Sequence, residues 1–376
     1  MAEVLTNGRV LTPRGLEAVT VVLEGDRIAQ VRPAVAGEPG VDLEAGYLLP
    51  GFIDAQVNGG GGVLFTDTPT VAAIVTIGAA HRRFGTTGFL PTLISDDLAT
   101  VATAIRAVDE AICAGVPGVL GIHIEGPFLS RHRKGIHDAS KFRILDDAAF
   151  DLLTSLKHGK TLVTLAPEAT TPRMIRRLVD AGIIVAAGHT DADYDTIRAA
   201  LEAGLSGFTH LFNAMSPLTS REPGAVGAAL EDEASWCGLI VDGRHVHPAV
   251  LRVALRARRR DRFMLVTDAL SSVGMTDKSF TMQGRAIRVV DGVCVDEKGT
   301  VAGSDLDMAS AVRNIMAIAG VTVEDAVAMA SATPAAFLGL SQETGIIAPG
   351  QRADLVLADA HLHVRRTWIA GRSEAA

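Results

Sequence analysis

Eight apolar runs of strand length alternate with amphipathic stretches of helical periodicity across the middle of the chain. Near-continuous apolar strands are typical of a parallel sheet that helices cover on both faces. Eight strand–helix units of this kind favour a closed (β/α)8 barrel, the TIM-like class of α/β fold, over a doubly wound open sheet. We expect the strands at residues 52–58, 87–92, 119–125, 161–168, 182–189, 207–213, 237–242 and 262–268.

The two ends of the chain have a different pattern, in which short strand-like runs are separated by turn signals. Neither end is long enough to form a stable sheet alone. We therefore expect the N- and C-terminal segments to pair into one small β-sandwich domain, with the barrel inserted between them. The predicted boundaries are 1–48 and 346–376 for the two parts of this small domain and 49–345 for the catalytic barrel. Within the barrel segment, residues 279–301 are expected to form an inserted β-hairpin after the eighth strand.

The composition of the chain argues against several classes of protein. Of the 376 residues, 48% are hydrophobic and 21% are charged, which favours a large packed core over a disordered chain. The net charge of −8 argues against a nucleic-acid partner bound through a basic surface. The three cysteines, Cys113, Cys237 and Cys294, lack paired spacing, and no apolar stretch approaches the roughly 20 residues that span a bilayer. We therefore expect a cytoplasmic protein with no membrane partner.

The residues that end the apolar runs carry the strongest functional signal. In a barrel of parallel strands the carboxyl ends all open onto one face, where active sites are built. Most of the expected strands finish on a side chain capable of chemistry, which a random surface would not produce so consistently. These residues are Asn58, Glu125, Glu168, His189, His210, Asp242 and Asp268.

Glu125, His189 and His210 have the composition of a metal site. A carboxylate at the end of a buried apolar strand must be paired or metal-bound, because an isolated buried charge is very costly. The two histidines belong to the expected fifth and sixth strands, which are neighbours in a barrel, so their imidazoles can converge. Two histidines and one carboxylate with an open position form a common catalytic zinc set. The alternative for any single histidine of the set is a hydrogen-bonded core residue.

Asp268 ends the expected eighth strand and is the candidate acid–base residue. Hydrolysis at a metal needs a base that takes a proton from the attacking water and an acid that returns one to the leaving amine. A single carboxylate near the metal can do both in sequence. The alternative is a structural aspartate that caps the next loop.

Several motifs resemble those of the amidohydrolase superfamily. Residues 49–54, LPGFID, are similar to its opening strand, and SATPA at 331–335 with GQRADLV at 350–356 is similar to its closing segment. Further matches extend over essentially the whole chain and are specific to the family of N-acetylglucosamine-6-phosphate deacetylases. They are HIEGPF at 123–128, KGIH at 134–137, GHT at 188–190, THLFNAM at 209–215, REPG at 221–224, DGRH at 242–245 and VTDA at 266–269.

The resemblance implies roles for the residues at the matching positions. Glu125, His189 and His210 would be the ligands of one divalent metal ion, with Zn²⁺ favoured and Fe²⁺, Co²⁺ or Mn²⁺ as alternatives. Asp268 would be the acid–base residue. His137, which by spacing alone reads as an exposed loop histidine, would hydrogen-bond the acetyl carbonyl and stabilise the developing oxyanion.

The resemblance also implies a set of residues that binds the phosphate of an amino-sugar phosphate. Arg221 and His245 match the family's phosphate-binding pair, with Asn213 and the backbone of Ala214 close to the sugar phosphate. The fork of N–H donors of an arginine makes charge-assisted bonds to phosphate oxygens, although by spacing alone Arg221 is an ordinary loop arginine. In the family the phosphate-binding histidine comes from a neighbouring subunit, so His245 indicates a homodimer.

The first strand departs from the pattern of the superfamily. Many members carry His-x-His there and hold two metal ions, whereas this chain has Gln56-Val57-Asn58. This departure resembles the deacetylases that keep one metal ion, because an amide side chain is a poorer ligand than an imidazole. The sequence leaves open whether a second ion binds weakly near Gln56 and Asn58.

The resemblance implies a metal-dependent hydrolase that removes the acetyl group from N-acetyl-D-glucosamine 6-phosphate, in amino-sugar catabolism and cell-wall recycling. The galactosamine epimer of this substrate is not distinguished by the motifs. Two other functions stay open from the residues alone. Another amidohydrolase activity on the same barrel would not need Arg221 and His245, and an inactive barrel kept as a binding protein would have lost its metal ligands.

Overall fold

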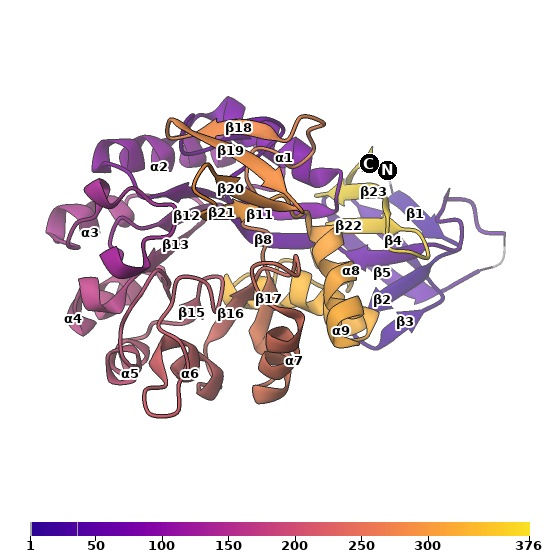
Figure 1. Cartoon of the computed structure of the whole chain (residues 1–376). Helices are drawn as coiled ribbons and strands as arrows, with labels where there is room; N and C mark the ends of the chain where they lie inside the picture. Colours follow the sequence, from indigo (N-terminus) through magenta and orange to yellow (C-terminus); the bar gives the residue numbers. More distant parts are fainter. Residues whose placement is uncertain (1, 36) are drawn as a thin grey trace.

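A closed barrel of eight parallel strands forms the centre of the computed structural model, which describes residues 2–35 and 37–376 (Figure 1). The strands follow one another around the barrel in chain order, and every neighbouring pair is parallel. Val57 bridges Ala269 in parallel, so the last strand returns to the first and closes the sheet. The eight strands are β8 (Phe52–Val57), β11 (Thr86–Ile94), β12 (Gly121–Glu125), β13 (Lys160–Leu165), β14 (Ile184–Ala187), β15 (Gly207–Phe208), β16 (Trp236–Leu239) and β17 (Phe263–Leu265).

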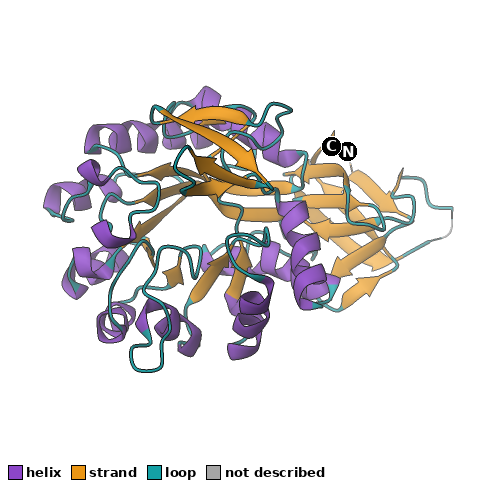
Figure 2. Ribbon diagram, in the orientation of Figure 1, coloured by secondary structure: helices purple, strands orange, loops and turns teal. Residues whose placement is uncertain are grey.

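Helices surround the barrel on its outside (Figure 2). They alternate with the strands because amphipathic stretches follow the apolar runs, and each buries one apolar face against the sheet. Among the described residues no helix is long and apolar enough to cross a membrane. The α-helices are α1 (Val71–Arg82), α2 (Leu98–Cys113), α3 (Asp147–Leu153), α4 (Pro172–Asp180), α5 (Tyr194–Glu202), α6 (Gly224–Glu231), α7 (Pro248–Ala257), α8 (Met308–Ala319), α9 (Val323–Ala330) and α10 (Ala332–Phe337).

Short polar side chains start many of these helices. The side chain of the residue before the first helical turn accepts a hydrogen bond from a free backbone N–H of that turn, and each such cap stabilises its helix by about 1 kcal/mol. The residues that do this are Thr70, Asp146, Thr171, Asp193, Asp307 and Thr322. Short 3-10 helices occupy the loops at η1 (Arg131–Arg133), η2 (Ala139–Lys141), η3 (Pro167–Ala169) and η4 (Arg260–Arg262).

A small β-domain is built from both ends of the chain and lies beside the barrel in Figure 1, with the two chain ends adjacent. One sheet holds β1 (Ala2–Thr6), β4 (Val19–Glu24), β5 (Arg27–Pro33) and β6 (Val41–Asp42). The other holds β2 (Arg9–Thr12), β3 (Gly15–Glu17), β7 (Tyr47–Pro50), β22 (Leu355–Ala358), β23 (Val364–Ile369) and β24 (Arg372–Ala375).

The two ends of the chain share one core in this small β-domain. β7 pairs with β2 on one side and with β22 on the other, so N- and C-terminal segments form a single sheet. Buried side chains from both ends, among them Leu5, Leu48, Leu355 and Trp368, pack between the sheets. The predicted fold class is therefore confirmed, whereas the residue boundaries predicted for the domains stay a prediction.

The segment after β17 differs from the expected hairpin. It forms a four-stranded antiparallel sheet of β18 (Ser279–Met282), β19 (Arg285–Val290), β20 (Val293–Asp296) and β21 (Val301–Ser304). We call this the inserted sheet. Two of its tight turns place Gln283-Gly284 and Asp291-Gly292 at positive φ, which is the backbone that a two-residue hairpin turn requires. A further two-stranded pair, β9 (Gly59–Gly60) and β10 (Val63–Leu64), follows β8.

Candidate metal and catalytic site

Glu125 is the last residue of β12, whereas the other side chains that were expected at strand ends lie one to three residues beyond those ends. β14 stops at Ala187, β15 at Phe208 and β17 at Leu265, so the predicted strand ends at 189, 213 and 268 are too long. His189, His210 and Asp268 have φ values of 49°, 34° and 51°, in the left-handed region that non-glycine residues seldom adopt. This conformation turns the chain out of each strand at the carboxyl end of the barrel.

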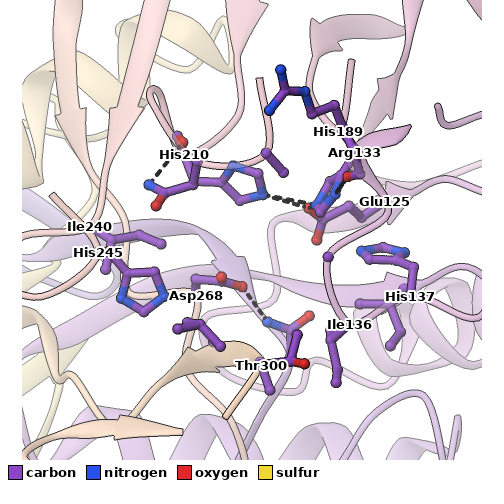
Figure 3. Close-up of a pocket in the computed structure, with 18 of the residues that line it drawn as sticks. Glu125, Arg133, Ile136, His137, His189, His210, Ile240, His245, Asp268 and Thr300 are labelled. Carbon is purple, nitrogen blue, oxygen red and sulfur yellow. Dashed lines mark hydrogen bonds and ion pairs between the residues drawn. The ribbon is translucent and has the colours of Figure 1, made fainter. Parts of the chain in front are cut away.

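The structure brings Glu125, His189 and His210 together in the mouth of the barrel (Figure 3). Oε1 of Glu125 lies 3.1 Å from Nε2 of His189 and 3.0 Å from Nε2 of His210, and the two Nε2 atoms lie 3.1 Å apart. All three residues are buried. Three ligand atoms therefore converge on one point, as a metal centre requires.

The hydrogen bonding of His189 fits a metal ligand. Its Nδ1 lies 2.8 Å from the carbonyl oxygen of Arg133, to which the ring must donate, so Nε2 carries the lone pair that faces the cluster. Burial raises the pKa of Glu125, but the two neighbouring imidazoles of His189 and His210 outweigh this effect and hold that pKa well below its ordinary value. An ionised carboxylate and an imidazole lone pair directed at one point are a donor set suited to a divalent cation.

Asp268 lies beside this cluster and is held by two amide side chains of the first strand. Nδ2 of Asn58 donates to Oδ1 of Asp268 at 2.6 Å, and Nε2 of Gln56 lies 3.2 Å from the same oxygen and 3.2 Å from Oε2 of Glu125. Burial raises the pKa of Asp268 to about 7, and the nearby charge of Glu125 acts in the same direction. The residues that replace His-x-His are thus donors to the candidate base and to a candidate ligand.

His137 is buried in the pocket, so the interpretation from spacing alone is wrong. Its side chain is 2% exposed and its ring centroid lies 4.4 Å from that of His189. The backbone N–H of Ser95 donates to Nδ1 at 3.3 Å, which places the proton of the neutral ring on Nε2. Burial lowers the pKa of His137 to about 3, so the ring is neutral at physiological pH. His137 can therefore offer a neutral N–H donor to the pocket.

His245 and Asn213 line the same pocket, together with Ala214. Nδ1 of His245 lies 2.6 Å from Oδ2 of Asp242, so the carboxylate at the end of the seventh run orients the imidazole. Nδ2 of Asn213 donates to the carbonyl of His210 at 3.2 Å. His245 belongs to the pocket of its own chain, and its position gives no support to a second subunit.

Among the sequence-derived candidates, Arg221 and Glu168 lie away from the catalytic cluster. Arg221 is exposed on the loop before α6 and does not line the cavity. Glu168 lies in η3, where its carboxylate accepts hydrogen bonds from Oγ1 of Thr190 and from the backbone N–H of Asp191. Glu168 therefore fixes the loop that follows His189 and does not reach the cluster.

The pocket also contains residues that sequence reasoning missed. The cavity has a volume of about 360 Å³ and is lined on one side by His132 and Arg133, and on another by Met282 and residues 300–303 of the inserted sheet. The basic run at 131–134, on the loop after the third strand, is a signal that could have indicated His132 and Arg133. No comparable signal in the sequence indicates that a sheet inserted after the eighth strand returns to cover the pocket.

Comparisons with known proteins agree with this geometry. A family model described as the amidohydrolase family matches residues 47–373. The N-acetylgalactosamine-6-phosphate deacetylase of Shewanella sp. (strain ANA-3) is 44% identical to the chain. The matched region covers 98% of the chain and 94% of that relative.

Two solved structures share the fold over the whole length of the chain. The N-acetylglucosamine-6-phosphate deacetylase of Pasteurella multocida superposes with a TM-score of 0.96 at 32% identity and covers 100% of both chains. A mutant of the N-acetyl-D-glucosamine-6-phosphate deacetylase of Mycobacterium smegmatis, in complex with N-acetyl-D-glucosamine-6-phosphate, has a TM-score of 0.91, 34% identity and 100% coverage of both chains.

Proposed function

From the membership of this chain in the amidohydrolase family, we infer that it is a metal-dependent deacetylase of N-acetyl-D-glucosamine 6-phosphate, which it hydrolyses to glucosamine 6-phosphate and acetate. The observation that carries this proposal is the convergence of Glu125, His189 and His210 beside Asp268 in one pocket. A barrel that serves only as a binding protein would not require a buried set of metal ligands next to a buried base. The proposed role of the enzyme is in amino-sugar catabolism and cell-wall recycling.

Glu125, His189 and His210 would hold one divalent ion, which we propose to be Zn²⁺, with Fe²⁺, Co²⁺ or Mn²⁺ as the alternatives for a nitrogen and oxygen donor set. The chemistry that such an ion supplies is polarisation of the amide carbonyl and a lowered pKa of water. Gln56 and Asn58 point their N–H donors toward Asp268 and Glu125. Their amide nitrogens therefore serve the carboxylates, and an amide oxygen is a poorer ligand than an imidazole, so one strongly held ion is favoured.

Asp268 accepts a proton from water as the carbonyl carbon is attacked, and then gives it to the amine nitrogen as the C–N bond breaks. The hydrogen bond from Asn58 fixes the carboxylate in position for both transfers. His137 donates its Nε2 proton as a hydrogen bond to the carbonyl oxygen, on which negative charge develops. The neutral state of the ring supports this role, because a neutral imidazole carries one N–H that can donate this hydrogen bond.

We propose that the phosphate of the substrate is bound by His245, Asn213 and the backbone of Ala214, all of which line the pocket. Asp242 keeps His245 oriented through the hydrogen bond to Nδ1 and leaves Nε2 for the ligand. Arg221 does not line the pocket of its own chain, so its proposed contact with the phosphate has to come from a second subunit. The proposal therefore includes a homodimer.

An apolar surface beside Arg221 supports the proposed dimer. Leu218, Val250 and Val253 are 55%, 38% and 60% exposed, and together with Phe212 and Val226 they line one shallow groove. Exposed apolar clusters of this kind on a folded protein mark contact surfaces. The loop that carries Leu218 also carries Arg221, so an interface here would include the arginine.

The 6-phosphate of the galactosamine epimer is a second candidate substrate. It is favoured by one observation, the 44% identity with a relative named as an N-acetylgalactosamine-6-phosphate deacetylase. The two substrates differ at one hydroxyl and would place the same acetamido group on the cluster.

We also propose a cytoplasmic location, because Cys113, Cys237 and Cys294 are all free thiols.

A substrate panel tests the proposed function. Release of acetate is measured with N-acetylglucosamine, its 6-phosphate and the galactosamine 6-phosphate epimer, using protein loaded with one defined metal. We expect turnover that needs the metal and the 6-phosphate. Equal rates on the sugars with and without phosphate would refute the proposed phosphate site, and the ratio of kcat/KM for the two epimers decides between the candidate substrates.

A further inference from the structure

A second group of metal-ligating side chains lies outside the catalytic pocket. Asp109 and Cys113 are four residues apart on α2, so they share one face of the helix. His158 lies in the segment between α3 and β13, and its ring meets that face. One ligand atom from each residue lies within 4.8 Å of the other two.

The geometry at Nδ1 of His158 separates two possible functions of this group. Nδ1 lies 2.9 Å from Oδ1 of Asp109 and 3.3 Å from Sγ of Cys113. In a nucleophilic Cys–His–Asp arrangement the base uses one ring nitrogen for the thiol and the other for the carboxylate. Here both partners lie at the same nitrogen, so a proton relay through the ring does not fit. Convergence of three ligand atoms on a common point is the arrangement of a cation site.

We propose that Asp109, Cys113 and His158 form a second metal site, which binds a thiophilic divalent cation of the Zn²⁺ type. Thiolate, imidazole and carboxylate are the three ligand types of zinc, and thiolate disfavours Mg²⁺ or Ca²⁺. Two of the three separations between its ligand atoms, 2.9 and 3.3 Å, are close to the 3.0 to 3.1 Å separations in the Glu125 cluster. Cys113 is exposed and the side chain of His158 is 53% exposed, so water completes the coordination.

The backbone prepares this site before any ion binds. The main-chain N–H of His158 donates to Oδ1 of Asp109 at 3.0 Å, which fixes the loop against the helix. The carboxylate of Asp109 and the ring of His158 are therefore held next to each other by the protein itself.

The position of the site indicates a structural function. Cys113 is the last residue of α2 and His158 comes just before Lys160, the first residue of β13. The catalytic cluster lies at the carboxyl ends of the strands, so the second site lies at the opposite, amino end of the barrel. Residues at that end serve stability more than chemistry. An ion here would tie α2 to the start of β13, so it should raise Tm and leave turnover unchanged.

Co²⁺ provides a direct test in the full chain, because a thiolate bound to Co²⁺ gives a charge-transfer band in the near ultraviolet. Metal-free protein is titrated with Co²⁺, and the catalytic cluster contains only nitrogen and oxygen ligands, so the thiolate band reports the second site alone. Cys237 and Cys294 are buried, and burial raises the pKa of each thiol to about 12. We expect the band to reach the intensity of one thiolate-bound Co²⁺ per chain.

Three variants complete the test. Cys113→Ser and His158→Gln should each abolish the band and the rise in Tm that added Zn²⁺ produces, with deacetylation of the substrate unchanged. Glu110→Gln, an exposed acid on the same helix, should keep both. The proposal is overturned if the wild-type chain gives no band, or if the band survives His158→Gln, since that would be a lone surface thiol. The result does not depend on whether the proposed deacetylase activity is found.

Discussion

At the scale of single residues, three backbone conformations shape the candidate site. His189, His210 and Asp268 each adopt a left-handed conformation two or three residues after a strand. Such a conformation costs roughly 1–2 kcal/mol for a residue with a side chain. Glycine would avoid the cost but has no functional group to offer. The chain therefore adopts a strained backbone at the positions of two candidate ligands and the candidate base, whose side chains point into the mouth of the barrel.

The role of Asp268 can be tested with a nearly isosteric change. Asp268→Asn removes the proton acceptor, while the new amide oxygen can still accept the hydrogen bond from Asn58. We expect kcat to fall by about 10²- to 10⁴-fold, the usual contribution of a general acid–base group. Metal content and binding of the substrate, measured by metal analysis and calorimetry, should be retained. Near-normal turnover in this variant would refute the proposed role.

His81 should make stability depend on pH. Its ring is fully buried, Nε2 donates to the carbonyl of Gly59 at 2.8 Å, and Nδ1 has no hydrogen-bond partner among the described residues. Burial lowers the pKa of His81 below its ordinary value of about 6.5. Below that pH the unfolded chain binds a proton that the folded chain excludes, so this contribution to stability is present above pH 6.5 and is lost as the pH falls.

His81→Gln provides the measurement. It keeps an N–H donor for Gly59 but cannot titrate, so the free energy of unfolding of the variant should fall less than that of the wild type between pH 7.5 and 5. The difference should approach about 1.4 kcal/mol for each pH unit below the ordinary pKa. His361→Gln, at an exposed histidine, is the control and should follow the wild type. Parallel pH profiles of wild type and His81→Gln would contradict the argument.

At the scale of elements, the strands could be predicted but their ends could not. Apolar runs placed all eight barrel strands, because burial of a parallel strand on both faces leaves a clear signal. Apolar residues recur past Phe208 and Leu265, at Leu211, Phe212 and Val266, so the pattern does not mark where the backbone leaves the sheet there. The turn of the backbone out of each strand depends on packing at the mouth of the barrel between residues far apart in the chain. The local sequence does not indicate this packing.

The candidate site residues also divide into those that the sequence pattern could predict and those that it could not. Glu125, His189, His210 and Asp268 could be found from their places at the ends of apolar runs, because a barrel brings those ends together. His137 lies on a loop, and only the resemblance to the deacetylases indicated it. The structure explains why spacing failed, since Ser95 and the neighbouring His189 enclose a loop that would otherwise be exposed.

The inserted sheet is an element that the sequence indicated only in part. Turn signals suggested β-structure after β17, but not that four strands would pair and return to the pocket. β21 ends on Ser304, whose backbone N–H donates to the carbonyl of Asp268 at 3.0 Å. Gly303 is required beside it, because a Cβ there would lie 2.8 Å from the same carbonyl oxygen. The inserted sheet therefore supports the backbone of the candidate base.

The inserted sheet should also position His137. Nη1 of Arg285 donates to the carbonyl of Ile136 at 2.8 Å, next to His137 in the chain. Arg285→Met removes this bond, which is worth about 1 kcal/mol, so we expect kcat to fall by up to about fivefold with metal binding unchanged. Arg288→Met, at an exposed position of the same strand, is the matched control. An unchanged kcat for Arg285→Met would show that the loop is ordered without this contact.

At the scale of the whole molecule, the proposed dimer predicts complementation between defective chains. Arg221→Ala and Asp268→Asn should each be poorly active alone. When the two proteins are mixed under conditions of subunit exchange, one site of each mixed dimer has an intact Asp268 and an intact arginine from its partner. Activity should then recover to about one quarter of the wild-type value, since half of the dimers are mixed and half of their sites are complete.

A variant of the apolar surface provides the control for this experiment. Val253→Asp in both chains places charges in the proposed interface and should abolish dimers in sedimentation analysis, together with the recovery. Mixed dimers that form without any recovery would show that Arg221 does not act across the interface. A chain that is monomeric at all concentrations would remove the homodimer from the proposal.

The small β-domain has a consequence for how the molecule is made. β2 and β7 leave the ribosome before the barrel, whereas β22 and β23, which complete their sheet, leave after it. During synthesis the first strands therefore wait with an unpaired edge and with Leu48 uncovered, until the segment that carries Leu355 and Trp368 arrives. Nascent chains are vulnerable to aggregation and to proteases throughout that interval. A chaperone that recognises apolar strand edges would therefore bind the nascent chain. It would no longer bind once the N- and C-terminal strands have paired.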